Sequence, residues 1–278
     1  MKIGVFDSGV GGLTVLRALL PRIPDAEYFY LGDTARLPYG SKSQATIARY
    51  AVSSSQFLID QGCEFLVIAC NTASALALDE IGLTAAPYAV PVVGVITPGA
   101  AAAAAISQTR DTLVIATSAT VESHAYSAAC ESHGLRSIEK ACPLLVPLVE
   151  EGWIDHPVTA EVTRIYLSEL HRQASNASLV PDTLVLGCTH YPLLREVFEA
   201  GVRELWPGHP AAVIDSAEAT AREVERQLNA SFSNRPAAGI RSPATRFYAT
   251  DSVVKFRQLG TRFLNQPISD VELVDLGG

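Results

Sequence analysis

Short apolar runs alternate with longer amphipathic stretches along most of the chain. Runs at 3–6, 65–69, 92–96, 112–116 and 183–186 are each followed by small or polar residues and then by a helix-like stretch. Such runs are typical of buried parallel strands, which alternate along the chain with the helices that cover them. We therefore expect an α/β fold with mostly parallel sheets.

One pattern occurs twice. Residues 66–72 and 184–190 both combine an apolar strand, a small residue, a cysteine and then polar residues. Upstream of each, 3–8 and 113–118 form a second similar pair in the same order. The repeat predicts two similar, pseudo-symmetric α/β units. The alternative is chance, because strand–turn–helix units recur in any α/β protein.

The two units predict two domains. We expect residues 1–97 together with 208–278 to form a discontinuous first domain, and 98–207 to form the second. A loop is predicted at 230–244, which is rich in Ser, Pro, Asn and Gly. Open α/β sheets bind ligands at the carboxyl ends of their strands. We therefore expect the active site in the cleft between the domains.

The repeated pattern places one thiol, Cys70 or Cys188, after a strand of each unit. A helix start favours the thiolate, so we expect the pKa of each thiol to be lowered. A thiolate on one face of a stereocentre can remove its proton while a thiol on the other face returns one. The alternative is that both are buried structural thiols, the commonest fate of free cysteine.

No cofactor is expected. Pyridoxal phosphate needs a Schiff-base lysine, and none of the four lysines lies in either cysteine motif. A zinc ion held by Cys70, Cys188 and His190 would have three ligands without close spacing, so no metal is expected either. Backbone N–H groups and polar side chains at helix starts can instead hold substrate carboxylates. The candidates for this role are Ser8, Asn71, Thr72, Thr117, Thr120 and Thr189.

Composition restricts the partners. The chain has 21 basic and 29 acidic residues, a net charge of −8, so we expect neither nucleic acid nor membrane as a partner. The most apolar tract, 85–106, is interrupted by Pro and Gly, and no signal peptide is visible. We expect a cytoplasmic protein whose five cysteines are free thiols.

Sequence blocks spread over most of the chain carry a family resemblance. They include D-S-G-V-G-G at 7–12, C-N-T at 70–72 and C-T-H-Y-P at 188–192. Further blocks lie at 32–34, 38–40, 94–100, 142–147 and 215–221. Together these blocks resemble the glutamate racemases. Leu37 and Thr97 depart from the pattern of many relatives, but neither is an assigned thiol.

The resemblance implies an isomerase that interconverts L- and D-glutamate without a cofactor, for peptidoglycan synthesis, cell-wall biogenesis and cell shape. It implies Cys70 and Cys188 as the catalytic thiols, with Cys70 acting on D-glutamate and Cys188 on L-glutamate. Glu150, which has Glu151 beside it, is implied to support proton transfer together with Asp7 and His190. The implied substrate-binding residues are Asp7, Ser8, Tyr39, Gly40, Asn71, Thr72, Thr189 and His190.

The small molecule glutamate is the expected partner, and a homodimer is the expected assembly. A related aspartate-type racemase or a one-thiol decarboxylase is an alternative on the same fold, although a decarboxylase needs only one of the two cysteines. A regulatory protein that binds DNA gyrase is an alternative of a different class.

Overall fold

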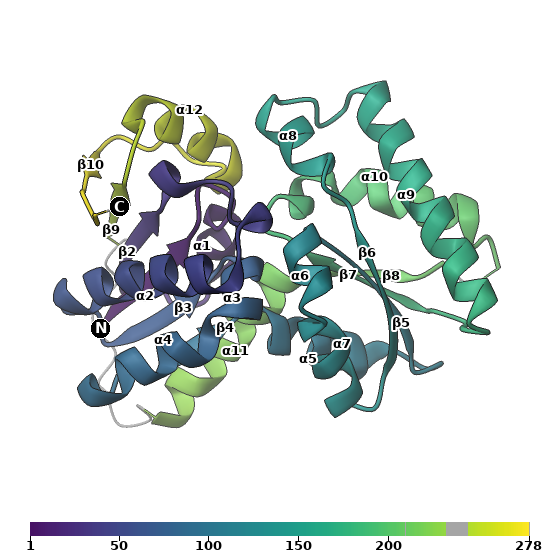
Figure 1. Ribbon diagram of the computed structural model, residues 1–278, viewed down its shortest axis with the longest axis horizontal. Coiled ribbons are helices and arrows are strands. Elements are labelled where there is room, and N and C mark those ends of the chain that lie inside the picture. The colour runs from purple at the N-terminus through teal and green to yellow at the C-terminus, as the bar shows by residue number, and fades with distance from the viewer. Residues whose placement is uncertain (209, 232–243, 278) are drawn as a thin grey trace. The chain divides into compact units, whose positions relative to one another are not determined.

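The computed structural model describes residues 1–208, 210–231 and 244–277, so most of the loop predicted at 230–244 lies outside the described residues. The chain divides into two compact units. The first consists of Met1–Val95 and Ala217–Gly278, and the second of Ile96–Ser216. Both chain ends belong to the first unit (Figure 1).

The first unit contains a six-stranded sheet in the order β10-β9-β2-β1-β3-β4, with every neighbouring pair parallel. The strands are β1 (Lys2–Asp7), β2 (Glu27–Gly32), β3 (Phe65–Ile68), β4 (Val92–Gly94), β9 (Thr245–Ala249) and β10 (Val271–Leu273). In the register between β1 and β3, Phe6 pairs with Ile68. The two central strands therefore end side by side.

Helices cover this sheet because its central strands are apolar on both faces. Phe6, Leu66 and Ile68 form a buried core with Ile47 of α2 and Ile81 of α4. The helices of this unit are α1 (Leu13–Leu19), α2 (Gln44–Asp60), α3 (Asn71–Leu76), α4 (Leu78–Ala85), α11 (Ser216–Ser231, which begins at the last residue of the second unit) and α12 (Val253–Leu264). Short 3₁₀ helices are η1 (Thr34–Arg36), η2 (Tyr39–Ser41) and η3 (Ala86–Tyr88).

The second unit contains a four-stranded parallel sheet in the order β6-β5-β7-β8. Its strands are β5 (Asp111–Ala116), β6 (Arg136–Ala141), β7 (Thr183–Gly187) and β8 (Ala212–Asp215). Its helices are α5 (Ile96–Ile106), α6 (Ser118–Glu122), α7 (Ala125–Ser132), α8 (Leu145–Glu150), α9 (Pro157–Asn176), α10 (Arg195–Leu205) and the 3₁₀ helix η4 (Tyr191–Leu194).

The two sheets share a connectivity. In the order β2-β1-β3-β4 of the first unit, the strand that comes second along the chain lies at one side, followed by the first, third and fourth. The order β6-β5-β7-β8 of the second unit follows the same rule. In each, the first strand of the repeated pattern pairs with the strand that precedes the motif cysteine. The predicted α/β fold with two similar, mostly parallel sheets is confirmed.

All five predicted strands are present, with one boundary corrected. The strand predicted at 92–96 ends at Gly94, and α5 begins at Ile96. Pro98 lies in the first turn of that helix, where its missing N–H leaves no hydrogen bond unmade. Among the described helices, none combines the length and the apolarity that a membrane span requires.

Candidate active site

The first cysteine cluster consists of Asp7, Ser8, Cys70, Asn71 and Thr72, at the carboxyl ends of β1 and β3. Both faces of these strands are covered, and their residues are almost all buried. Polar side chains are therefore accommodated at the point where each strand ends. Cys70 caps α3, and its sulfur accepts a hydrogen bond from the Ala73 N–H at 3.4 Å. Its thiol also donates to Ser8 Oγ at 3.5 Å. Asn71 and Thr72 are the buried first residues of α3.

Asp7 lies beside Cys70 and is only 2% exposed. Its Oδ2 accepts a hydrogen bond from the Gly9 N–H at 2.9 Å. A Cβ atom on Gly12 would come within 2.5 Å of Asp7 Cβ, so the turn after β1 can pack this closely only with glycine there. The glycine-rich turn therefore positions the Asp7 carboxylate and the Ser8 hydroxyl.

The pKa of the Cys70 thiol is raised to about 12, chiefly by burial and further by the negative charge of Asp7. The hydrogen bonds with Ser8 and Ala73 act in the opposite direction and are too weak to prevail. The predicted lowering of this pKa is therefore wrong, because removal from water outweighs the dipole of a helix only six residues long. Cys70 is therefore a neutral thiol when no cation lies beside it.

Tyr39 and Gly40 belong to η2, after the cis peptide bond between Leu37 and Pro38. Tyr39 is buried, and its hydroxyl donates to Asp33 Oδ2 at 2.5 Å. Burial and the Asp33 carboxylate raise the pKa of Tyr39 well above its usual value. The hydroxyl is therefore committed to Asp33, and any contact with a ligand would come from the ring or the backbone.

Asp33 is a buried anchor whose role the sequence analysis did not assign, although it lies in one of the quoted blocks. Arg36 Nε donates to both of its oxygens, at 2.9 and 2.7 Å. Thr250 Oγ1 donates to Oδ1 at 2.9 Å, although it is 217 residues away in the chain. No local pattern could predict this contact, which attaches the segment of Tyr39 to the carboxyl end of β9.

The second cysteine cluster consists of Glu150, Cys188, Thr189 and His190, where β7 and α8 end. Cys188 is 5% exposed, and its Sγ lies 4.0 Å from His190 Nδ1. His190 Nε2 lies 3.2 Å from Glu150 Oε1, and Thr189 Oγ1 lies 3.4 Å from His190 Nδ1. Glu150, and not the exposed Glu151, is thus the carboxylate that contacts the motif histidine.

The backbone after Cys188 differs from that after Cys70. Cys188 is followed by a turn and by the four-residue η4, and α10 begins only at Arg195. A helix follows both cysteines, but only Cys70 directly precedes a regular α-helix. Pro192 allows the short 3₁₀ helix because its ring presets the required φ.

His190 is held as a cation. Burial alone would lower the pKa of His190, but its hydrogen bonds to Cys188 and Glu150, together with the negative charges of both groups, raise it to about 10. The Cys188 sulfur therefore lies next to an imidazolium. The two cysteine clusters thus differ: Cys70 has a carboxylate neighbour and Cys188 a cationic one.

Two further tyrosines were not identified from the sequence. Tyr191 is fully buried, and its hydroxyl donates to the carbonyls of Cys142 and Ala116 at 2.9 and 3.2 Å. Tyr30 is fully buried, and its hydroxyl donates to the Gly9 carbonyl at 2.9 Å. Each tyrosine therefore restrains the backbone beside a motif cysteine. Tyr191 lies inside the quoted C-T-H-Y-P block, whereas no sequence signal marks Tyr30.

Thr117 and Thr120 lie at the carboxyl end of β5, in the same unit as Cys188. Thr117 directly precedes α6, and its Oγ1 lies 2.9 Å from Thr120 Oγ1. In the repeated pattern Thr117 corresponds to Asp7, and Ser118 corresponds to Ser8.

Comparison with known proteins identifies the class. A family model described as Asp/Glu/Hydantoin racemase matches residues 13–224. The glutamate racemase of Koribacter versatilis is 52% identical over 295 residues, covering 99% of this chain and 98% of its own. That of Geobacter metallireducens is 43% identical over 276 residues, covering 99% and 96%.

Solved structures with a similar fold are also glutamate racemases. Glutamate racemase from Francisella tularensis in complex with D-glutamate matches with a TM-score of 0.85 and 35% identity, covering 99% of this chain and 97% of that one. The Thermus thermophilus enzyme in complex with β-chloro-D-alanine matches with a TM-score of 0.82 and 42% identity over the same shares. The fold and these similarities place the chain among the isomerases. It belongs to the Asp/Glu/hydantoin racemase family.

Proposed function

We propose that this protein interconverts L- and D-glutamate without a cofactor, using Cys70 and Cys188 as its two bases. The observation that carries the proposal is that topologically equivalent strands of the two units each lead into a buried cysteine with hydrogen-bonding neighbours. Relatives called glutamate racemases match the chain over nearly its full length, which supports glutamate as the substrate.

The proposal requires both thiols to reach one α-carbon from opposite faces. For L-glutamate, the Cys188 thiolate takes the α-proton and becomes a thiol, leaving a planar carbanion. The Cys70 thiol then donates its proton to the other face and becomes a thiolate, which completes D-glutamate. The reverse reaction exchanges these roles. Cys188 then loses a proton to solvent and Cys70 takes one up from solvent, which restores the starting pair.

The different surroundings of the two thiols suit the reaction that starts from L-glutamate, in which Cys188 is the base and Cys70 the acid. The raised pKa of Cys70 keeps it protonated and ready to donate. The His190 cation, which contacts Glu150, lies beside the Cys188 sulfur that must accept the proton. When Cys70 serves as the base, the ammonium group of the bound amino acid supplies the compensating charge beside Asp7.

Substrate carboxylates are proposed to bind the polar groups at the starts of helices. Asn71 and Thr72 open α3, and Thr189 precedes η4, so their N–H groups and side chains lie where the strands end. Ser8 can contribute its hydroxyl, while Tyr39 and Gly40 can contribute ring and backbone contacts. His190, which lies beside Cys188, is the remaining proposed substrate contact.

D-Glutamate made in this way would supply peptidoglycan synthesis, and through it the cell wall and cell shape. The homodimer and the location in the cytoplasm stay predictions.

The proposal is tested by circular dichroism of L-glutamate incubated with the purified protein, with no cofactor added and L-aspartate run in parallel. Decay of the glutamate signal to zero, with deuterium from D₂O at the α-carbon, is the expected result. Decay with aspartate alone would reassign the substrate and keep the two-thiol reaction. No decay with either amino acid, from folded protein with reduced thiols, would contradict the proposal.

A further inference from the structure

The chain passes between its two units at two places, and each place adjoins a strand that leads into a motif cysteine. The first unit is interrupted after Val95, and the second unit ends at Ser216. We call these places the two crossings, and we call β3 and β7 the cysteine strands. Val95 directly follows β4, and Ser216 directly follows β8. Because β4 is paired with β3 and β8 with β7, each crossing leaves its sheet beside a cysteine strand.

The strand register places each crossing level with the end of its cysteine strand. Ile68 pairs with Gly94 in the first unit, and Leu186 pairs with Asp215 in the second. Ile68 and Leu186 each come two residues before the motif cysteine. Both ladders end at these pairs, since the chain turns into α5 or α11 at the crossing.

A serine hydroxyl joins the first crossing to its cysteine strand. Ser74, on α3, donates from its Oγ to the Ile68 carbonyl at 2.9 Å. The same Oγ accepts a hydrogen bond from the Val95 N–H at 3.3 Å. A Cβ atom on Gly94 would come within 3.0 Å of this Oγ, so the glycine leaves room for the hydroxyl. The hydroxyl thus takes the place of a further rung between β3 and the chain that follows β4.

A second serine makes the corresponding contact in the second unit. Ser216 is itself the crossing residue, and its Oγ donates to the Leu186 carbonyl at 2.9 Å. The hydroxyl of the fully buried Tyr126 also hydrogen-bonds to the Ser216 side chain. The two serines are supplied by different parts of the units, α3 and the start of α11, yet each contacts the carbonyl two residues before a motif cysteine.

These contacts matter for a reaction that needs both thiols, so the following inference rests on the proposed function. The thiols belong to different units, and each must hold a fixed position relative to the crossing that joins its unit to the other. We propose that Ser74 and Ser216 are positioning residues, each fixing the cysteine two residues beyond the carbonyl that it contacts. A displacement of a reacting group by about 1 Å can lower a rate about 100-fold, so one lost hydrogen bond is enough to affect catalysis.

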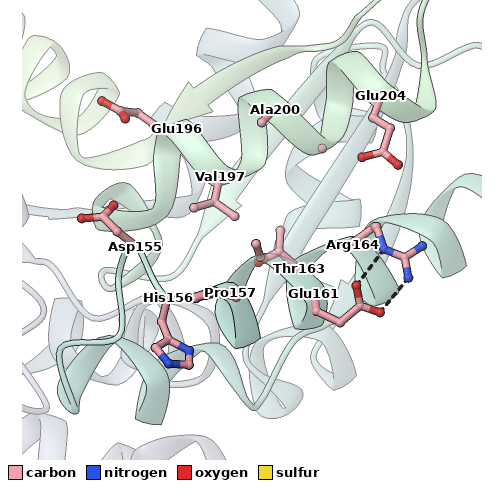
Figure 2. A pocket seen from close by; sticks show the side chains of 12 residues that line it. Asp155, His156, Pro157, Glu161, Thr163, Arg164, Glu196, Val197, Ala200 and Glu204 are labelled. Atoms are coloured by element: carbon pink, nitrogen blue, oxygen red, sulfur yellow. Dashed lines mark hydrogen bonds and ion pairs between the residues drawn. The ribbon is translucent and has the colours of Figure 1, made fainter.

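The groove between α9 and α10 has none of these features. It encloses about 540 Å³, and Figure 2 shows Asp155, Glu161 and Glu196 among the side chains that line it. Its lining residues belong to neither cysteine cluster and to neither crossing. Its carboxylates disfavour glutamate, which carries two carboxylates of its own. We therefore assign this groove no part in the reaction.

Ser74→Ala and Ser216→Ala each remove one hydroxyl and test the inference. We expect each to lower kcat about tenfold and to change KM by less than about twofold, because positioning acts on the proton transfers rather than on substrate binding. Thr183→Val is the matched control. Thr183 is fully buried at the start of β7, and its Oγ1 donates to Thr112 Oγ1 at the opposite end of the strand from Cys188.

The melting temperatures separate positioning from stability. All three variants lose a buried hydrogen bond and should show similarly lowered melting temperatures. Only the two serine variants should lose activity when assayed well below those temperatures. An equal fall in kcat in Thr183→Val would show a general loss of stability and would overturn the inference.

Glutamate deuterated at the α-carbon shows which thiol has been displaced. In the proposed cycle Cys70 removes the α-proton of D-glutamate and Cys188 removes that of L-glutamate. Ser74→Ala should make the transfer at Cys70 more rate-limiting, which raises the deuterium effect on kcat/KM for D-glutamate and lowers it for L-glutamate. Ser216→Ala should do the opposite. Shifts in the same direction in both variants, or no shifts, would overturn the inference.

The wild-type protein distinguishes this inference from the proposed function. No racemisation by the wild type would contradict the proposed function and remove this inference with it. Racemisation by the wild type, with kcat unchanged in both serine variants, would overturn this inference alone.

Discussion

His190 and Glu150 form a partly buried pair in which Nε2 and Oε1 are 3.2 Å apart, although 40 residues separate them in the chain. The contact orients the imidazole so that Nδ1 faces Cys188. It also contributes to the raised pKa of His190, so the histidine carries a positive charge at neutral pH. The chemistry proposed for Cys188 therefore depends on a residue that ends α8.

Glu150→Gln removes the charge that helps to raise the pKa of His190 and should lower that pKa. The wild-type imidazolium persists until the pH approaches about 10, so its loss in the variant should begin at lower pH. We expect the alkaline limb of the kcat/KM profile for L-glutamate to move to lower pH, and kcat to fall at least about tenfold.

The matched control is Glu151→Gln, which removes the same charge from an exposed neighbour. An unchanged pH profile in Glu150→Gln would show that this carboxylate does not tune the site.

Cys70→Ser and Cys188→Ser should each lower kcat for racemisation by about 10²- to 10⁴-fold or more, because each removes one of the two bases. Cys63→Ala is the control, since Cys63 is also a buried free thiol of the first unit but lies outside both cysteine clusters. Circular dichroism of both enantiomers measures the rates. Near-normal turnover in both directions by either serine variant would contradict the two-base assignment.

Cys70 should react slowly with iodoacetamide in the free protein. Its pKa of about 12 leaves roughly a thousandfold less thiolate at pH 8 than an ordinary cysteine has. Alkylation followed by mass spectrometry should show a rate that still rises with pH above 9, where an unfolded control levels off. A rate at pH 8 equal to that of the unfolded chain would contradict the raised pKa.

Tyr30→Phe removes the hydrogen bond to the Gly9 carbonyl and should loosen the turn that carries Ser8. We expect a loss of about 1 kcal/mol in the free energy of unfolding, together with a several-fold lower kcat. Tyr28→Phe is matched to it, because Tyr28 is equally buried and donates to the Leu19 and Ile23 carbonyls away from this turn.

Denaturant unfolding and kinetics of both variants separate stability from catalysis. A similar fall in kcat in the two variants would show that Tyr30 acts only through general stability.

The strands that carry the cysteines could be predicted because their signal is local. An apolar run that ends abruptly at a small residue and a cysteine, as at 65–70 and 183–188, already specifies a buried strand and the polar turn after it. Comparison of the two runs showed that the units share a plan. The edge strand β10, its neighbour β9 and the partly polar β6 carry a weaker pattern and were not predicted.

The chain alone thus determined the α/β class, the repeated layout and the positions of Cys70 and Cys188 at strand ends, since each depends on neighbours within a few residues. Only the tertiary structure decided the protonation of these sites. Burial beside Asp7 raises the pKa of Cys70, and Glu150 reaches His190 across 40 residues, because desolvation and charge act through space rather than along the chain.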